Sequence, residues 1–552
     1  MSRHSSRPRD DADGLAPEGA VVTGTGTASP GSPASSGMHE ELRRGGASAA
    51  RRRERTLALL VFGAGTGTLA TEIAASRLLA PYYGSSTIVW ANLIGLVLLA
   101  LSLGYWIGGR VSDRRPEPRL LGQLVVGSGL LVAAIPFVTD PILGVAAEGL
   151  DELSAGAVVG SFFAVLLLFA PPVFLLGMVS PFAIRLAVRD VATAGQTAGR
   201  LYALSTAGSL LGTFLTALVL IPLIGTQRTL LASAAVLVLS GSLLLGRRWL
   251  LLGGAVAALL AVPPGAIRAG EGLVYETESR YQFVRVTEQD GVRRLYLNEG
   301  VAVHSVWRAE TVLTGGVWDT FLAVPTLLER PPRSLAVLGN AGGTVARAFG
   351  RFYPGVEVDG VEIDPAVTDV AYRWFGLGDN PRVRTFDEDA RPFLRRVERR
   401  YDLVFVDAYH QPYVPFYLAT REFFELVRAR LAPGGLVALN VASVPGDEAL
   451  LDGLAGTLAD VFPEVRVWPA LRFNQLLVGL TAPPASRPAP DARLEPLVDL
   501  LRRDLSGPVE PAGDPWTDDH APVEWVTDQM IIRYAVEGGG FDETPLPTAP
   551  DG

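Results

Sequence analysis

The chain has 552 residues, 49% of them apolar, and contains neither Cys nor Lys, so that all 48 basic residues are Arg. These absences exclude disulfides, thiolate nucleophiles, Cys-ligated zinc, a P-loop lysine and a lysine general base. The five His residues are too few for a His-rich metal centre, and we predict no bound metal.

Charge is unevenly distributed along the chain, whose formal net charge is −9. From residue 266 to the end, 28 Arg stand against 42 Asp and Glu, a balance of −14, so the preceding part carries +5. An acidic C-terminal half argues against nucleic acid as a partner and favours small cationic ligands.

The first segment, residues 1–55, is rich in Gly, Ser, Pro, Ala and Arg and has few large apolar residues. This composition predicts a disordered tail. It ends in the arginine-rich stretch 51–55, directly before the first apolar run, which is typical of a cytoplasmic flank.

Between residues 56 and 265 the apolar residues gather into runs, several of which reach the roughly 20 residues needed to cross a bilayer. This predicts a multi-pass domain in the cell membrane, in contact with lipid. Buried core helices of a soluble protein are the less favoured alternative. The seven runs are 57–80, 88–109, 120–138, 156–178, 201–224, 229–246 and 249–264.

The sidedness of these runs is ambiguous. Arginines follow the second, fourth and sixth runs, at 110–119, 185–189 and 247–248, which predicts a cytoplasmic N-terminus. Seven crossings would place the following domain outside, although nucleotide donors are made in the cytosol. We therefore expect that residues 229–264 do not contribute two full spans and that the following domain is cytoplasmic. The pairs Gly104/Gly108 and Gly208/Gly212 also predict close helix packing.

Residues 270–535 change to alternating strands and helices, followed by a disordered tail at 536–552. A small antiparallel unit is expected at 273–299, with Asp290-Gly291 as its turn. The alternation beyond it predicts an α/β doubly wound sheet of the class I methyltransferase type, with its ligand at the carboxyl ends of the strands. The expected strands are 334–339, 356–363, 382–386, 402–406 and 435–441, and the expected helices are 365–375, 391–399 and 420–431.

Chemistry-bearing residues are predicted at these strand ends. The first strand leads into a turn containing Gly339 and Gly342, where a ligand can approach the backbone closely. The turn lacks a full G-x-G-x-x-G, so a dinucleotide site is not expected. Glu362, Asp389 and Asp407 follow the next strands in order. Each alone could be a surface carboxylate or a helix cap, but three in succession favour a nucleoside site.

Several motifs in this half resemble the aminopropyltransferases of the spermidine synthase family, and the N-terminal half is similar to the membrane region of their bacterial membrane-fused members. The N-terminal resemblance rests on Leu78-Leu-Ala-Pro81-Tyr-Tyr-Gly84 and Leu201-Tyr-Ala-Leu-Ser-Thr-Ala-Gly208. The C-terminal motifs are Ser279-Arg-Tyr281-Gln282, Val361-Glu362-Ile-Asp364-Pro365, Tyr401-Asp-Leu-Val-Phe-Val-Asp407, Thr420-Arg-Glu-Phe-Phe424, Leu431-Ala-Pro-Gly-Gly435 and Thr517-Asp-Asp-His520.

The resemblance implies an aminopropyltransferase that uses decarboxylated S-adenosylmethionine as co-substrate, without a prosthetic group. An amine such as putrescine would be the acceptor, and a homodimer is compatible with the family. The implied general base is Asp407. The implied nucleoside-binding residues are Gln282, Gly339, Gly342, Glu362 and Asp389, and the implied amine-binding residues are Tyr281, Tyr409 and His410.

Two departures from the family pattern bear on the substrates. Ala341 stands where the family usually has the aspartate that holds the aminopropyl ammonium, and no second aspartate follows Asp407 for the polyamine. Two alternatives therefore stay open: a methyltransferase that uses S-adenosylmethionine itself, and a polyamine transporter or sensor whose C-terminal domain only binds.

Overall fold

The computed structural model describes residues 34–84, 87–150, 156–262, 265–298, 302–409, 413–510, 513–536 and 546. The chain divides into two compact units, Met1–Arg55 and Thr56–Gly552. The expected tail at 1–33 and nearly all of the one at 536–552 lie outside the described residues. Residues 34–55 are helical, unlike the expectation of disorder, because their Ala, Glu, Leu and Arg residues are good helix formers.

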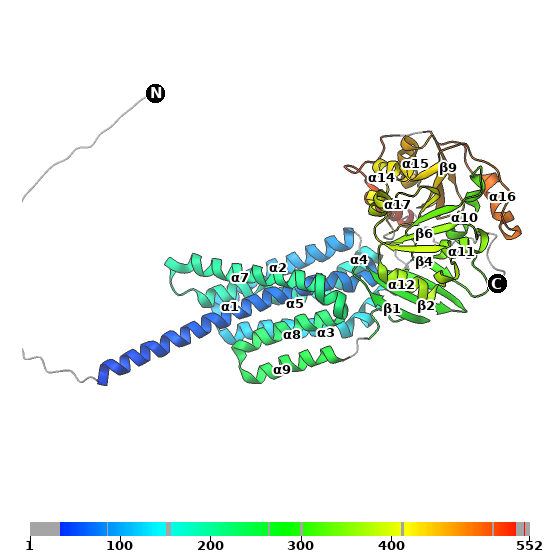
Figure 1. Ribbon diagram of the computed structural model, residues 1–552. Helices are drawn as coiled ribbons and strands as arrows, with labels where there is room; N and C mark the ends of the chain where they lie inside the picture. The colour runs from blue at the N-terminus through cyan, green and yellow to red at the C-terminus, as the bar shows by residue number, and fades with distance from the viewer. Residues whose placement is uncertain are drawn as a thin grey trace, which may run out of the picture. The chain divides into compact units, whose positions relative to one another are not determined.

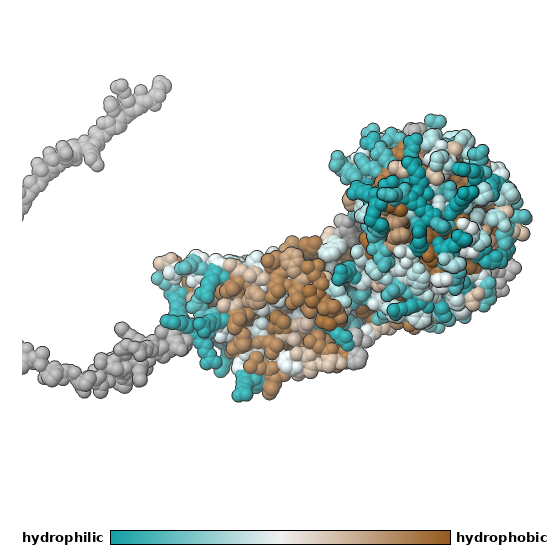
Figure 2. All heavy atoms as spheres, viewed as in Figure 1, coloured by the Kyte–Doolittle hydropathy of each residue, from teal (hydrophilic) through white to brown (hydrophobic). Residues whose placement is uncertain are grey.

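The N-terminal part of the second unit is a bundle of helices (Figure 1). Its surface carries a continuous apolar band, with polar residues at the end away from the α/β domain (Figure 2). The helices are α1 (Ala34–Tyr83), α2 (Thr87–Arg114), α3 (Pro118–Leu150), α4 (Gly156–Ala164), α5 (Ala170–Gly177), α6 (Val179–Ala187), α7 (Ala194–Leu215), α8 (Ile221–Leu245) and α9 (Arg247–Ala258).

Five helical stretches of the described chain are long and apolar enough to cross a membrane. The last of them, Val191–Leu245, changes direction at Gly225, whose φ of +77° is not helical. Before this point α7 runs parallel to α1, since Gly208 approaches Phe62 and Gly212 approaches Thr66. Beyond it α8 runs antiparallel to α1. This stretch therefore passes along the bundle twice.

Close packing of small residues holds the bundle together, as the G-x-x-x-G pairs predict. A Cβ on Gly104 would lie 2.4 Å from the Phe174 carbonyl oxygen, and one on Gly208 would lie 2.2 Å from that of Phe62. Larger residues at these two positions would force the helices apart, which explains why both are glycine.

The final helix, α9, has only 12 residues, enough for about 18 Å at 1.5 Å per residue. This agrees with the expectation that residues 229–264 do not form two full spans. Nevertheless α9 packs against α8, where a Cβ on Gly253 would meet Leu239, and leads the chain back toward the α/β domain.

Among the described residues, the contacts between the bundle and the α/β domain lie at one end of the bundle. The Tyr82 hydroxyl donates to the Ile267 carbonyl over 2.5 Å, and the Thr226 amide donates to the Glu278 carboxylate over 2.7 Å. The arginine-rich α2–α3, α6–α7 and α8–α9 connections lie at the other end, where Arg185 pairs with Asp113 at 3.3 Å. The arginine-rich connections and the α/β domain therefore lie at opposite ends of the bundle, because α9 adds a short return after α8.

The α/β domain begins with a four-stranded antiparallel sheet of order β1-β2-β3-β4. Asp290 and Gly291 form the two-residue turn between β2 and β3, with φ values of 52° and 71°, as the sequence predicts. The strands are β1 (Leu273–Glu278), β2 (Phe283–Gln289), β3 (Val292–Leu297) and β4 (Val303–Trp307).

The main sheet has seven strands in the order β10-β11-β9-β8-β5-β6-β7, with β5 to β9 parallel and β10 and β11 antiparallel. The five parallel strands coincide with the predicted ones to within a few residues. The strands are β5 (Ser334–Leu338), β6 (Glu357–Glu362), β7 (Val383–Asp387), β8 (Tyr401–Val406), β9 (Leu431–Ala442), β10 (Glu464–Trp468) and β11 (Asn474–Leu480).

Helices cover both faces of this sheet (Figure 1), as a doubly wound fold requires. One apolar cluster joins the sheet to α13, α14, α15 and α17, and another joins it to α10, α11 and α16. The small sheet packs against α12 through a third cluster. The helices are α10 (Val317–Ala323), α11 (Thr344–Phe352), α12 (Pro365–Trp374), α13 (Ala390–Arg396), α14 (Arg421–Ala429), α15 (Ala449–Val461), α16 (Glu495–Asp504) and α17 (Val523–Val536).

Candidate active site

A cavity lies at the carboxyl ends of the parallel strands, between them and the small sheet. Because parallel strands end at one edge, residues that are far apart in the sequence meet here. The predicted site residues that line the cavity are Tyr281, Gln282, Gly339, Glu362, Asp389, Asp407 and Tyr409.

Asp407 directly follows β8 and is held from two sides. Its backbone N–H donates to the Leu338 carbonyl over 2.9 Å, and its carboxylate accepts from the Asn440 side chain over 2.9 Å. Burial raises the pKa of the Asp407 carboxyl to about 7, although hydrogen bonds from Asn440 and Trp318 oppose the rise. A carboxyl with this pKa can both accept and release a proton near neutral pH.

Gly339 allows the backbone at Asp407 to approach the turn after β5. Its φ is +86°, and a Cβ at this position would lie 2.5 Å from the Asp407 carbonyl oxygen. We therefore expect Gly339→Ala to displace Asp407 and to reduce turnover by about 100-fold, since a small misplacement of a reacting group has an effect of that order.

Gly446 supplies the matched control, because its φ is +87° but a Cβ added to it would have no neighbour within 4 Å. Gly446→Ala should cost only the backbone strain of about 1–2 kcal/mol and keep its turnover. Steady-state rates and thermal melting of both variants check this. Equal rates in the two variants would contradict the positional role of Gly339.

Glu362 ends β6 and faces the same turn. Its carboxylate accepts from the Ala341 N–H over 3.0 Å and from the Asp364 N–H over 3.1 Å. Burial raises the pKa of the Glu362 carboxyl to about 7, with the backbone hydrogen bonds acting in the opposite direction. Each carboxylate oxygen retains a second lone pair, so Glu362 can still accept hydrogen bonds from a ligand.

Asp389 caps α13, accepting from the Arg391 N–H over 2.9 Å, and also accepts from the Tyr417 hydroxyl over 2.8 Å. Burial raises the pKa of Tyr417 above its usual range, so this hydroxyl remains a donor. A cap role and a ligand role are compatible here, because Asp389 still lines the cavity.

The loop before β2 is ordered by a short network. The Ser279 hydroxyl donates to the Asp364 carboxylate over 2.6 Å and accepts from the N–H groups of Tyr281 and Gln282 at 3.0 Å each. The Gln282 side chain also hydrogen-bonds to Asp364. This fixes Gln282 at one wall of the cavity and leaves the Tyr281 side chain 47% exposed.

Two predicted residues, Gly342 and Tyr409, are placed differently from the expectation. Gly342 does not line the cavity; it packs against Ser305, to whose hydroxyl its N–H donates over 2.8 Å. The Tyr409 hydroxyl is occupied by the protein, donating to the Asn440 carbonyl over 2.6 Å and accepting from the Ala442 N–H over 2.9 Å. His410 lies outside the described residues.

The sequence reasoning missed Asn440, His304 and Tyr417. Asn440 was detectable, because it is the only polar residue in the run Leu436–Val441, at the end of a strand. His304 and Tyr417 line the cavity from β4 and from the loop after β8. Neither stands in a pattern that singles it out.

The fold and these carboxylates define a class of protein, an α/β domain with a cavity at the carboxyl edge of a doubly wound sheet. Residues 318–471 match the spermine/spermidine synthase domain. This match lies within the α/β domain, which is joined to a large N-terminal helical region.

Curated relatives share parts of this domain. The chain is 36% identical over 191 residues to a probable polyamine aminopropyl transferase of Bifidobacterium longum, which covers 34% of this chain and 42% of the relative. It is 32% identical over 141 residues to a polyamine aminopropyltransferase of Vibrio vulnificus, a match that covers 25% of this chain and 46% of the relative. The match thus spans less than half the length of either relative.

One similar solved structure is that of a probable spermidine synthase from Corynebacterium glutamicum. It has 18% sequence identity and a TM-score of 0.34, and the match covers 48% of this chain and 94% of that chain.

Proposed function

We propose that the protein transfers an aminopropyl group from decarboxylated S-adenosylmethionine to a primary amine. The amine nitrogen attacks the methylene carbon beside the sulfonium. The new C–N bond forms as the C–S bond breaks. The electron pair of the C–S bond goes to sulfur, so that methylthioadenosine is the leaving group. The nitrogen releases its proton to the Asp407 carboxylate.

The observation that carries this proposal is the partly buried Asp407, oriented by Asn440, in one cavity with Glu362. An amine with a pKa near ~10.4 is neutral only about once in a thousand molecules near pH 7.4, equivalent to about 4 kcal/mol. A carboxylate at the reaction site attracts the ammonium and then accepts its proton. Glu362 is suited to the ribose hydroxyls, and Gln282 and Asp389 to the rest of the nucleoside.

The pH dependence should report on Asp407. Only the ionised carboxylate accepts a proton, and the pKa of Asp407 is raised to about 7. We expect kcat/KM for the amine to rise as the pH increases through about 7 and then to level off. Because the pKa of Glu362 is also raised to about 7, the profile of Glu362→Gln is needed as well. Loss of the rise in that variant would assign it to Glu362 instead.

A methyltransferase that uses S-adenosylmethionine is the second candidate, and Ala341 favours it. The turn beside Glu362 offers a methyl group where the family has a carboxylate for the aminopropyl ammonium. A bovine eEF1A lysine and N-terminal methyltransferase is 29% identical to this chain over 150 residues. Product analysis with each donor separates the two reactions.

The side of the membrane is a separate proposal. Arginines concentrate at the cytoplasmic ends of membrane helices, and the connections at the end remote from the α/β domain hold many of them. We propose that this end is cytoplasmic and that α9 returns the chain, so that the α/β domain is extracytoplasmic. The donor, which is made in the cytosol, must then be supplied on that side. The arginines are Arg110, Arg114, Arg115, Arg119, Arg185, Arg189, Arg200, Arg247 and Arg248.

Single cysteines test this placement cleanly, because the native chain has none. Glu117→Cys lies in the α2–α3 connection, and Glu425→Cys lies on the exposed side of α14. In intact cells, an impermeant maleimide should label the cysteine at 425 and reach that at 117 only after the membrane is opened. The reverse labelling would place the α/β domain in the cytoplasm.

A further inference from the structure

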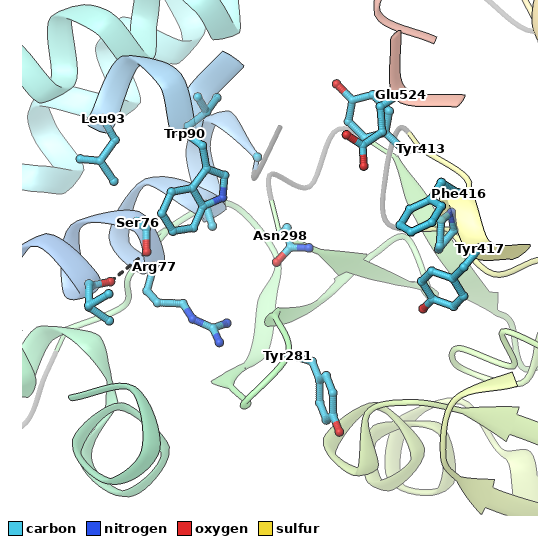
Figure 3. A pocket seen from close by; sticks show the side chains of 15 residues that line it. Ser76, Arg77, Trp90, Leu93, Tyr281, Asn298, Tyr413, Phe416, Tyr417 and Glu524 are labelled. Atoms are coloured by element: carbon cyan, nitrogen blue, oxygen red, sulfur yellow. Dashed lines mark hydrogen bonds between the residues drawn. The ribbon is translucent and has the colours of Figure 1, made fainter. Parts of the chain in front are cut away.

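A second and larger cavity, of about 720 Å³, lies between the helix bundle and the α/β domain (Figure 3). Trp90 and Arg77 stand on its bundle side, and Phe416 and Tyr417 face them from the α/β domain. This cavity and the active-site cavity share Tyr281, Pro415 and Tyr417. The two spaces therefore adjoin at these side chains.

Large aromatic side chains are exposed at this cavity rather than buried. Trp90 is 41%, Tyr281 47% and Phe416 46% exposed, and all three line it. Exposed aromatics that converge on one hollow beside a reaction site are characteristic of a ligand-binding surface. The protein carboxylates assigned to the donor already lie in the active-site cavity. This second space therefore suits the acceptor amine.

The bundle wall of the cavity belongs to the membrane-spanning helices. Ile73 and Ala80 come from α1, and Val89, Trp90 and Leu93 come from the start of α2. Tryptophan at the end of a spanning helix is typical of the interface between lipid and water. The cavity therefore lies at the level of the bilayer surface, with an apolar wall toward the lipid.

The cavity carries one charge of each sign, Arg77 on the bundle side and Glu524 on the side of the α/β domain. The Arg77 side chain reaches into the space and donates a hydrogen bond to the Arg280 carbonyl. Along the bundle wall a second ammonium would meet this guanidinium, whereas an apolar chain would meet Trp90, Leu93 and, across the cavity, Phe416. The acceptor that fits best has one reactive amine and an apolar remainder.

We propose that this cavity binds the acceptor, a primary amine carried on an apolar chain, with the amine directed past Tyr281 and Tyr417 to Asp407. The inference rests on the proposed aminopropyl transfer. Such a chain could belong to a membrane lipid with an amino head group or to a free long-chain amine, which share this chemistry.

The test uses the purified full-length protein with decarboxylated S-adenosylmethionine and a series of acceptors. These are 1,4-diaminobutane, primary n-alkylamines of increasing length, and vesicles containing phosphatidylethanolamine. We expect kcat/KM to rise by up to about fourfold for each methylene that enters the cavity. Product on the vesicle lipid identifies a lipid as the source, and product on the soluble amines alone identifies a free amine.

Two tryptophans of α2 give a matched pair of variants. Trp90 lines the cavity, whereas Trp106 is 59% exposed farther along the same helix, beside Arg110, and does not. Trp90→Ala should lower the ratio of long-chain to short-chain kcat/KM by at least about tenfold, and Trp106→Ala should leave it unchanged. Phe416→Ala, from the opposite wall, repeats the test if Trp90→Ala is unstable.

A chain-length series with no effect on kcat/KM, while 1,4-diaminobutane reacts well, would overturn this inference and leave aminopropyl transfer intact. An effect of chain length that survives both Trp90→Ala and Phe416→Ala would also overturn it, because the chain would then bind elsewhere. Absence of product with every acceptor would instead count against the proposed function.

Discussion

Asp407→Asn is expected to reduce turnover by about 10²–10⁴-fold, the usual effect of removing a general base. The amide can still accept a hydrogen bond in the same place but cannot take the proton of the attacking amine. Because Glu362 rather than Asp407 is assigned to the ribose, methylthioadenosine affinity should stay within a few-fold of wild type. Initial rates and calorimetry measure the two quantities separately.

Asp402 offers a control on the same strand. It lies at the opposite end of β8, where its carboxylate accepts from the Arg333 N–H over 2.8 Å, and it does not line the cavity. Asp402→Asn retains an acceptor oxygen there and should keep its turnover. If Asp407→Asn were as active as Asp402→Asn, the general base would have to be another group.

Glu362→Ala is expected to weaken methylthioadenosine binding by at least about 100-fold. Two charge-assisted hydrogen bonds to the ribose hydroxyls would be lost, each contributing about 1.5–3 kcal/mol. The substitution also leaves the Ala341 and Asp364 N–H groups without their acceptor, which should loosen the turn after β5. Glu362→Gln keeps an acceptor and should lose less affinity.

Glu357, at the other end of β6, controls for loss of a carboxylate from this strand. It is exposed and pairs with Arg399 at 2.9 Å, remote from the cavity. Titration calorimetry of Glu362→Ala and Glu357→Ala with methylthioadenosine tests the assignment of Glu362 to the nucleoside. Wild-type affinity in Glu362→Ala would mean that the nucleoside lies elsewhere.

Much of the α/β domain is predictable from the sequence because its signals are local. Apolar strands that end in single carboxylates, such as β8 before Asp407, show where parallel strands meet a ligand. The Asp290-Gly291 turn requires positive φ at both residues, which few other pairs adopt readily. The strands β10 and β11 carried no comparable signal, because their pairing with β9 depends on contacts distant in sequence.

The site was predicted less completely for the same reason. The residues that the sequence singled out carry charge or a glycine, whereas Asn440 matters through its contact with Asp407 on a neighbouring strand. Gly342 looked equivalent to Gly339, yet only the packing of β4 reveals that it faces Ser305. The arrangement of the bundle depends similarly on the reversal at Gly225, which the apolar pattern marks only as a gap between two runs.

Aminopropyl transfer with Asp407 as the general base is tested by mass spectrometry of the products formed by purified full-length protein. Decarboxylated S-adenosylmethionine and S-adenosylmethionine are each supplied with the amine acceptors, with Asp407→Asn run alongside wild type. We expect methylthioadenosine and an aminopropylated amine from the decarboxylated donor, and about 10²–10⁴-fold less of both from the variant in the same time. A methylated amine formed from S-adenosylmethionine alone, or no product although methylthioadenosine binds, would contradict it.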